Sequence, residues 1–190
     1  MLKLFMKYEK DENIMNISTR NIAQVSLLIA MSIVLSRMAS IRIAVGGVEG
    51  IRIGFGKLPI ILGSFILGPL YGGLVGAISD FLGYIIQPIG PYLPHFTIIS
   101  ALCGILPVVL FRIMRGNEDH IISIIIPVGI TVALTELFLI SYSLHIIFAI
   151  PWQILLVPRL ISVPITIVIY SYLIYVFVRR KVVQIAQHQG

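Results

Sequence analysis

Three charged residues lie inside apolar stretches of this chain, where they could bind a ligand or pair with one another. Asp80, Glu136 and Arg159 are each flanked by Ile, Leu, Val or Phe. An uncompensated charge inside a bilayer costs on the order of 2.5 to 3.5 kcal/mol on insertion scales, so each should face protein or a cavity. For Asp80 we favour a structural role, as an acceptor for helix termini or a partner of an internal cation, over ligand contact. For Glu136, pairing with Arg159 and contact with a ligand both stay open.

A second group of charges surrounds the first break in the apolar pattern. Arg37, Arg42, Arg52 and Lys57 cluster around residues 39–56. Counting six membrane spans places this loop on the outer side, where it violates the preference of Lys and Arg for the cytoplasmic side. An anionic ligand is the simplest explanation, and arginines that reach lipid phosphates are the alternative.

Other chemistries find little support in the sequence. It has neither the G-x-S-x-G motif of serine hydrolases nor the G-x-x-x-x-G-K-[ST] phosphate loop, so any ATP must be used by partners. His95, His145 and the interior acids lack ligand spacing, so we expect no metal site and no cofactor. Cys103 is the single cysteine, which excludes an intrachain disulfide and indicates a buried, inert thiol.

The elements that position these residues are predicted to be membrane helices. Of 190 residues, 58% are hydrophobic and 12% charged, and the mean hydropathy is +1.02, more apolar surface than a water-facing fold of this length can bury. A spanning helix needs about 20 residues, so six helices would use most of the chain. We therefore predict an all-α integral membrane protein with six transmembrane helices. The net charge of +6 is then explained by basic residues at membrane ends rather than by nucleic acid.

Glycine and proline mark where these helices begin and end. Residues 39–56 alternate β-branched residues with glycine, which predicts an extended, hairpin-like loop. Pro127, Pro158 and Pro164 are candidate bends within helices. The predicted helices cover residues 20–38, 57–67, 71–86, 96–112, 121–147 and 152–178.

The basic residues at helix ends predict the orientation. They precede the first helix and follow the fourth and the sixth, so both termini should be cytoplasmic in a multi-pass cell-membrane protein. We divide the chain into a cytoplasmic leader (1–19), a membrane domain (20–181) and a cytoplasmic tail (182–190). On the first helix, Ser26 and Ala30 form a small-xxx-small face that would let another helix dock closely.

Three motifs resemble the substrate-binding S components of energy-coupling-factor vitamin transporters, and in particular their folate-specific branch. They are LSR at the end of the first helix, GFGKLPIILGSFILGPLYGGLVGAISDFLGY, and PYLPHFTIISALCGILPVVLFR. Arg159 matches an Arg in the last helix of that branch. The resemblance covers about residues 20–180. It departs from the family at Ser26 and Ala30, which stand where an AxxxA pair is typical, and after LTE, where many relatives carry Trp.

The resemblance implies the S-component fold and a prokaryotic membrane protein that captures a vitamin from outside and has no catalysis of its own. It implies partners as well: folate or a related vitamin, a transmembrane coupling protein and two ATPase subunits. Ser26 and Ala30 would then dock the coupling protein.

Folate combines a planar pterin, an aromatic middle and two carboxylates, so its site should offer polar groups, aromatic walls and cations. Arg37 and Arg159 are our first choices for the carboxylates because guanidinium can bind them through two parallel hydrogen bonds; Lys57 and Arg52 come next. Membrane-interface anchoring is the alternative for the aromatic residues. The candidates for stacking or hydrogen bonding at the outer end are Tyr84, Tyr92, His95, Phe96 and Trp152.

Two alternatives stay open. The chain could be an S component for another anionic vitamin such as pantothenate, because similar motifs occur in those proteins. It could also be a small proton-coupled membrane carrier that uses Asp80 and Glu136, which would transport alone in liposomes. A subunit without any ligand would leave the four cations of the first loop unexplained.

Overall fold

The computed structural model describes residues 19–38, 40–45, 48–88, 91–116 and 120–187, with the backbone alone for 40–53 and 180–187. The expected leader therefore lies outside the described residues except for Thr19. The order of elements is α2 (Thr19–Met38), β1 (Ser40–Val45), β2 (Val48–Gly54), α3 (Lys57–Leu67), α4 (Pro69–Ile86), α5 (Pro94–Ile113), α6 (Ile121–Ala133), the π-helix η2 (Leu134–Ile140), α7 (Ser141–Phe148) and α8 (Trp152–Gln187).

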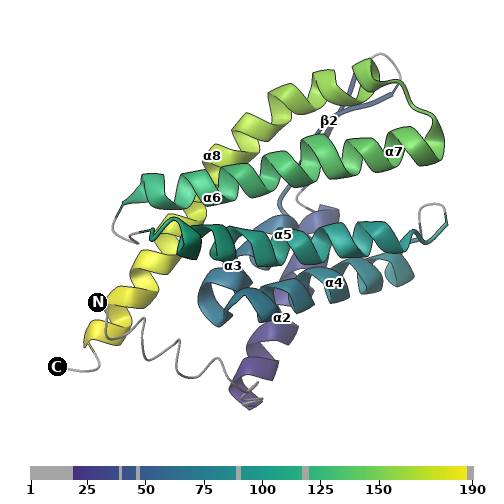
Figure 1. Ribbon diagram of the computed structural model, residues 1–190. Helices are drawn as coiled ribbons and strands as arrows, with labels where there is room; N and C mark the ends of the chain where they lie inside the picture. Colours follow the sequence, from purple (N-terminus) through teal and green to yellow (C-terminus); the bar gives the residue numbers. More distant parts are fainter. Residues whose placement is uncertain (1–18, 39, 46–47, 89–90, 117–119, 188–190) are drawn as a thin grey trace.

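Helices of membrane-spanning length dominate the described chain and confirm the predicted fold class. Five are long and apolar enough to cross a bilayer, where α6, η2 and α7 count as one continuous rod over Ile121–Phe148. The sixth, α3, has 11 residues. It is short because Gly68, with a φ of 102°, ends it and Pro69 begins α4 at once. In Figure 1 the α4–α5 and α7–α8 connections lie at one end of the bundle, and the α5–α6 connection and the C-terminal end of α8 lie at the opposite end.

The loop between α2 and α3 is an antiparallel hairpin, as its alternating sequence predicts. β1 and β2 pair from Ser40 opposite Gly54 to Val45 opposite Val48, with an irregularity between Ile43 and Ala44. The hairpin lies beside the first part of α8 (Figure 1).

Glycines allow α4 and α5 to touch backbone to backbone. A Cβ added at Gly76 would come within 2.1 Å of the Ser100 carbonyl oxygen, and one added at Gly104 within 2.1 Å of the Gly72 oxygen. This is the close approach that small residues permit between membrane helices. It fixes the relative position of the two helices that carry Asp80 and Thr97.

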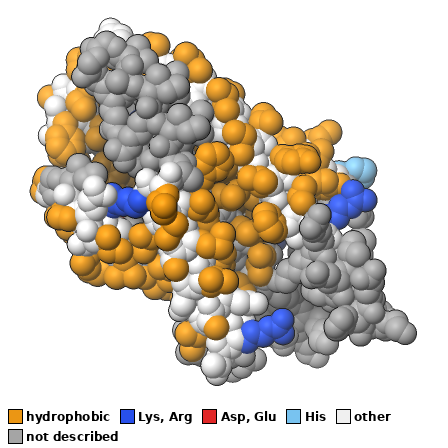
Figure 2. Space-filling view, turned by 180° about the vertical axis from the view of Figure 1, so that it is seen from behind, with side chains coloured by type: hydrophobic (Ala, Val, Ile, Leu, Met, Phe, Trp, Pro, Cys, Tyr) orange, Lys and Arg blue, Asp and Glu red, His pale blue; other side chains and the backbone are white. Residues whose placement is uncertain are grey.

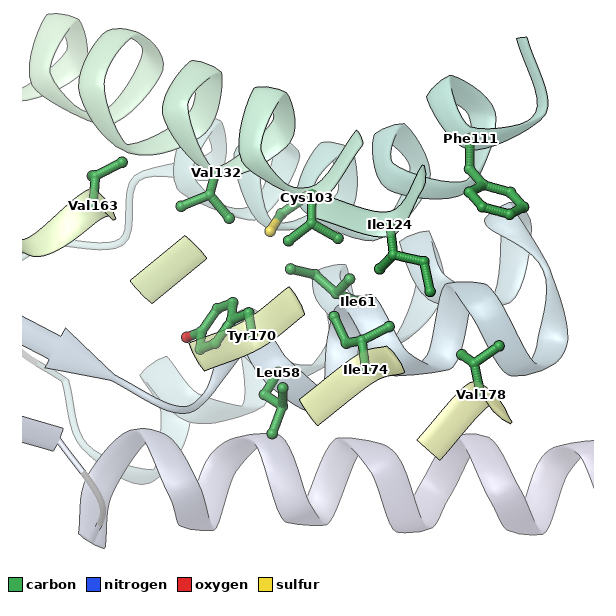
Figure 3. Close-up of a cluster of buried hydrophobic side chains, with 11 residues drawn as sticks. Leu58, Ile61, Cys103, Phe111, Ile124, Val132, Val163, Tyr170, Ile174 and Val178 are labelled. Carbon is green, nitrogen blue, oxygen red and sulfur yellow. The ribbon is translucent and has the colours of Figure 1, made fainter. Parts of the chain in front are cut away.

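A cluster of buried apolar side chains fills the space between α3, α5, α6 and α8. Figure 3 shows Cys103 among Ile61, Ile124 and Val132, and its thiol is buried as expected. Large apolar side chains also cover the outside, and Figure 2 shows them over most of one face, with Lys and Arg at few places. An apolar exterior of this kind fits a lipid environment.

Two features differ from the sequence prediction. The last helix was expected to end at Val178 but continues through Arg179 to Gln187, because basic residues are good helix formers and nothing in that stretch breaks a helix. The rod expected to be a plain helix with a bend at Pro127 contains instead a seven-residue π-helix, η2.

Candidate ligand-binding site

An ion pair inside the bundle joins α3 to the π-helix. The Lys57 Nζ lies 2.6 Å from the Glu136 Oε1, and the two side chains are 22% and 30% exposed. Lys57 stands at the first position of α3, directly after the hairpin, and Glu136 is the third residue of η2. The pair therefore ties the exit of the hairpin to the middle of the α6–η2–α7 rod.

Two hydrogen bonds fix the backbone that presents Lys57. The Ser32 hydroxyl on α2 donates to the Gly56 carbonyl oxygen at 2.7 Å. From the opposite side, the Tyr170 hydroxyl on α8 donates to the Gly54 carbonyl oxygen. A Cβ on Gly56 would meet the Ser36 Cβ at 2.6 Å, so glycine is needed for this close approach to α2.

Arg159 brings a second cation to the same place from α8. Its Nη1 donates to the Glu136 carbonyl oxygen and to the Ser141 Oγ, both at 2.6 Å. Lys57, Glu136 and Arg159 therefore meet at the junction of α3, η2 and α8, and we call these three residues the interior cluster. It contains two cations and one carboxylate, a formal charge of +1 within a largely apolar bundle. The open question about Glu136 is partly answered, because its carboxylate pairs with Lys57 and its main chain binds Arg159.

Arg37 uses its donors differently, at the C-terminal end of α2. Its Nη1 donates to the Gln87 Oε1 at 2.7 Å, and its Nη2 donates to the Gly83 carbonyl oxygen at 2.6 Å and to the Gln87 carbonyl oxygen at 3.4 Å. These acceptors belong to the C-terminal end of α4, where the Gly83 carbonyl oxygen also accepts from the Gln87 backbone N–H at 3.2 Å. Arg37 thus caps α4 and holds the start of the α4–α5 connection.

Asp80 accepts hydrogen bonds from hydroxyl groups of α5. Its Oδ2 accepts from the Thr97 Oγ1 at 2.7 Å, and its Oδ1 from the Ser100 Oγ at 3.4 Å. The Thr97 Oγ1 also lies 2.8 Å from the Tyr92 hydroxyl. Because the single Thr97 hydrogen goes to the carboxylate, the Tyr92 hydroxyl must be the donor. These contacts agree with the structural role that we favoured, although the partners are hydroxyls and neither helix termini nor a cation.

The predicted aromatic residues form pairs near the α4–α5 and α7–α8 connections. The Tyr92 ring lies 5.1 Å from that of Tyr84, and the His95 ring lies 4.7 Å from that of Phe96. The ring centroids of Trp152, at the start of α8, and His145, in α7, lie 4.9 Å apart. The structure brings Tyr84 and Tyr92 together and places Trp152 in a separate pair.

Two further predictions concern other surfaces. The Arg52 side chain lies outside the described residues, and its backbone pairs with Arg42 in the hairpin. Ser26 and Ala30 are both exposed on α2. They are therefore available for a partner helix.

The sequence reasoning missed the uncharged polar partners, which are Ser32, Gln87, Thr97 and Ser141. Ser141 follows Glu136 by five residues, a spacing that places neither residue beside the other in an α-helix. Gln87 precedes Pro88 at the end of α4, and such a position could have suggested a helix-end contact. Within the described ranges, no group of His, Cys, Asp and Glu could hold a metal ion.

The fold and the interior cluster define a multi-pass membrane protein with a polar site enclosed by its helices. The family model described as "ECF-type riboflavin transporter, S component" matches residues 16–180. The chain belongs to this family of S components of ECF-type transporters. It is therefore a transporter component and not an enzyme, as the resemblance implied.

Individual relatives agree with this assignment. The folate transporter FolT of Clostridium novyi (strain NT) is 34% identical over 151 residues, which cover 79% of this chain and 83% of the relative. The crystal structure of FolT bound with folic acid matches with a TM-score of 0.71 and 25% identity, over 86% of this chain and 96% of that one. A structure of the S component of a bacterial ECF transporter matches with a TM-score of 0.55 and 18% identity, over 90% and 98%, and shows a likeness of fold.

Proposed function

We propose that this chain is the folate-binding S component of an ATP-driven ECF importer. The observation that carries the proposal is the charge balance of the interior cluster. Lys57 and Arg159 supply two positive charges and Glu136 one negative charge. An excess cation among membrane helices is costly, and a ligand carboxylate would remove that cost when it binds.

The two transporters named FolT support folate as the ligand. Arg159 and Lys57 would bind or attract the glutamate carboxylates. Arg37 would act by holding the α4–α5 connection, and Asp80 by holding α5. Around the mouth of the site we propose contacts from Arg52, Tyr84, Tyr92, His95, Phe96 and Trp152.

Riboflavin is a second candidate because the matching family model carries that name. Its ring system has no carboxylate, so it would leave the extra positive charge of the interior cluster without a partner. Titration of the purified protein with folate, with riboflavin and with pantothenate separates the candidates. We expect folate to bind well below micromolar concentration, and riboflavin binding alone would overturn the proposal. A mass spectrum of ligand retained through purification is an independent check.

We also propose that both termini face the cytoplasm of a prokaryotic cell. Arg20, Arg112 and Arg115 lie at helix ends that would share the cytoplasmic side, and α8 continues past Arg179 into the tail (182–190). The relative from Clostridium novyi supports a prokaryotic origin.

The exposure of Ser26 and Ala30 supports their proposed role in docking a transmembrane coupling protein that works with two ATPases. Reconstitution in liposomes tests this assembly. We expect folate uptake with the coupling protein, the ATPases and ATP, and none with the chain alone. Ser26→Leu should reduce uptake and leave folate affinity unchanged. Uptake by the chain alone, driven by a proton gradient, would instead indicate a carrier.

A further inference from the structure

The π-helix η2 places two groups on one face that an α-helix would separate. In an α-helix each residue turns by about 100°, so residues five apart lie about 140° from each other around the axis. In a π-helix the repeating hydrogen bond joins residues five apart, which therefore follow one another along the same face. Glu136 and Ser141 are five apart; Glu136 lies within the π-helix Leu134–Ile140, and Ser141 directly follows it.

Arg159 uses this alignment directly. Its Nη1 reaches the Glu136 carbonyl oxygen and the Ser141 Oγ, each at 2.6 Å. The Ser141 hydroxyl donates in turn to the same carbonyl oxygen at 3.2 Å. One nitrogen of the guanidinium is thus held by two acceptors that only the π-helical register brings together.

The side chains of η2 lie in different surroundings. Thr135 is buried and Leu137 packs against the apolar cluster, whereas Leu134 and Phe138 are 40% and 66% exposed. Within α7, Ser141 is the buried residue, and the rest of that helix is partly or fully exposed. The register of η2 therefore brings one polar side chain of α7, Ser141, into the bundle at the interior cluster.

We infer that the π-helix Leu134–Ile140 is a positioning element that sets the Arg159 guanidinium for a ligand carboxylate. In the described chain both hydrogen bonds of Arg159 use Nη1, so the edge formed by Nε and Nη2 keeps two parallel N–H donors. That edge has the geometry for bidentate binding of a carboxylate. The inference rests on the proposed function, since it assumes a carboxylate ligand.

Deleting Leu134, with one glycine inserted after Ala149 to keep the chain length before α8, should convert η2 to a regular α-helix in which Glu136 and Ser141 stay five residues apart and therefore lie on different faces. Leu134→Ala is the matched control because it removes the same side chain and keeps the register. We expect the deletion to raise the folate Kd at least about tenfold, and the control to stay within about twofold of the parent. In an Arg159→Ala background the deletion should add less than about twofold. An unchanged Kd, or an equal effect in both backgrounds, would overturn the inference.

Ser141→Ala keeps the inference testable if the deletion variant does not fold. Its matched control is Ser143→Ala, because the Ser143 hydroxyl makes a local bond of 2.8 Å to the Leu139 carbonyl oxygen and does not touch Arg159. We expect the Kd to rise about threefold to tenfold for Ser141→Ala and to stay unchanged for Ser143→Ala. Equal effects of the two would count against the inference.

Thermal unfolding of the ligand-free protein separates this inference from the proposed function. If η2 positions Arg159, the Tm changes of Ser141→Ala and Arg159→Ala should be non-additive without any ligand. Non-additive changes in a protein that does not bind folate would end the proposed function and leave the positioning of Arg159 standing. Additive changes would overturn the positioning, whatever the ligand.

Discussion

Arg37 and Arg159 look equivalent in the sequence, yet the structure gives them different surroundings. Both were expected to bind the carboxylates of a ligand. Two nitrogens of Arg37 donate hydrogen bonds to Gly83 and Gln87 at the C-terminal end of α4. One nitrogen of Arg159 donates hydrogen bonds to η2 and α7, and the residue belongs to the interior cluster, whose formal charge is +1. The comparison teaches that a membrane arginine is a binding candidate when its partners leave one edge of the guanidinium, with its two parallel N–H donors, for a ligand.

The two interior acids differ in the same way. Asp80 is held by the hydroxyl groups of Thr97 and Ser100, which fix α5 against α4. Glu136 forms an ion pair with Lys57, which comes from an element 79 residues away in the chain. Asp80 therefore belongs to the contact between α4 and α5, and Glu136 belongs to the interior cluster.

Replacing each arginine by alanine should give the largest difference between the two residues. Arg159→Ala should weaken folate binding about hundredfold, because a buried charge-assisted contact to a carboxylate is lost. Arg37→Ala should lower the Tm and weaken binding by less than about fivefold, because its partners are within the chain. Isothermal titration and thermal unfolding of both variants measure this difference. Arg159→Lys keeps the charge without the paired donors, so its folate Kd should lie between those of the parent and Arg159→Ala. Equal losses of folate affinity in Arg37→Ala and Arg159→Ala would contradict the distinction between the two arginines.

The ion pair between Lys57 and Glu136 should show the next largest effect. Lys57→Ala removes the ion pair at 2.6 Å and should cost about 2 kcal/mol of folding stability, reduced from a fully buried pair by the partial exposure of both side chains. The double variant Lys57→Met with Glu136→Gln should recover part of that loss, because it removes the carboxylate together with its lysine. Thermal unfolding in detergent tests both. A double variant less stable than Lys57→Ala would show that the charges stabilise the bundle by themselves.

Neutralising Asp80 should have a smaller effect than breaking the ion pair. Asp80→Asn keeps an oxygen that accepts from Thr97 and loses the charge that strengthens that bond, so we expect about 1 kcal/mol of destabilisation. Thr97→Val removes the donor and should cost about the same, with Ser100→Ala as the control for the longer contact of 3.4 Å. Loss of folate binding at unchanged stability in Asp80→Asn would instead mark Asp80 as a ligand contact.

Local patterns in the sequence predicted the fold well and the site in part. Hydropathy and glycine-proline spacing predicted six helices, the short α3 and the hairpin, because these follow from bilayer thickness and backbone sterics. The π-helix η2 leaves no comparable local signal, since its register is tied to contacts with Arg159 on another helix. The pairing of Glu136 also depends on tertiary contacts. The sequence suggested Arg159 as its partner, whereas in the structure Lys57 binds its carboxylate and Arg159 binds its carbonyl oxygen. Charge alone identified the residues of the interior cluster, and tertiary structure decided how they pair.

The smallest predicted effect concerns the hydroxyl of Tyr92, in the connection between α4 and α5. Tyr92→Phe removes the donor to Thr97 and keeps the ring beside Tyr84 and Phe81, 5.1 and 5.7 Å away. We expect a loss of about 0.5 kcal/mol in stability, because Thr97 still donates to Asp80. Tyr92→Leu removes the ring pairs as well and should cost about 1 kcal/mol more. If Tyr92→Phe raised the folate Kd as much as Arg159→Ala, the Tyr92 hydroxyl would contribute as much to binding as the Arg159 guanidinium, and the contrast between the two arginines would no longer hold.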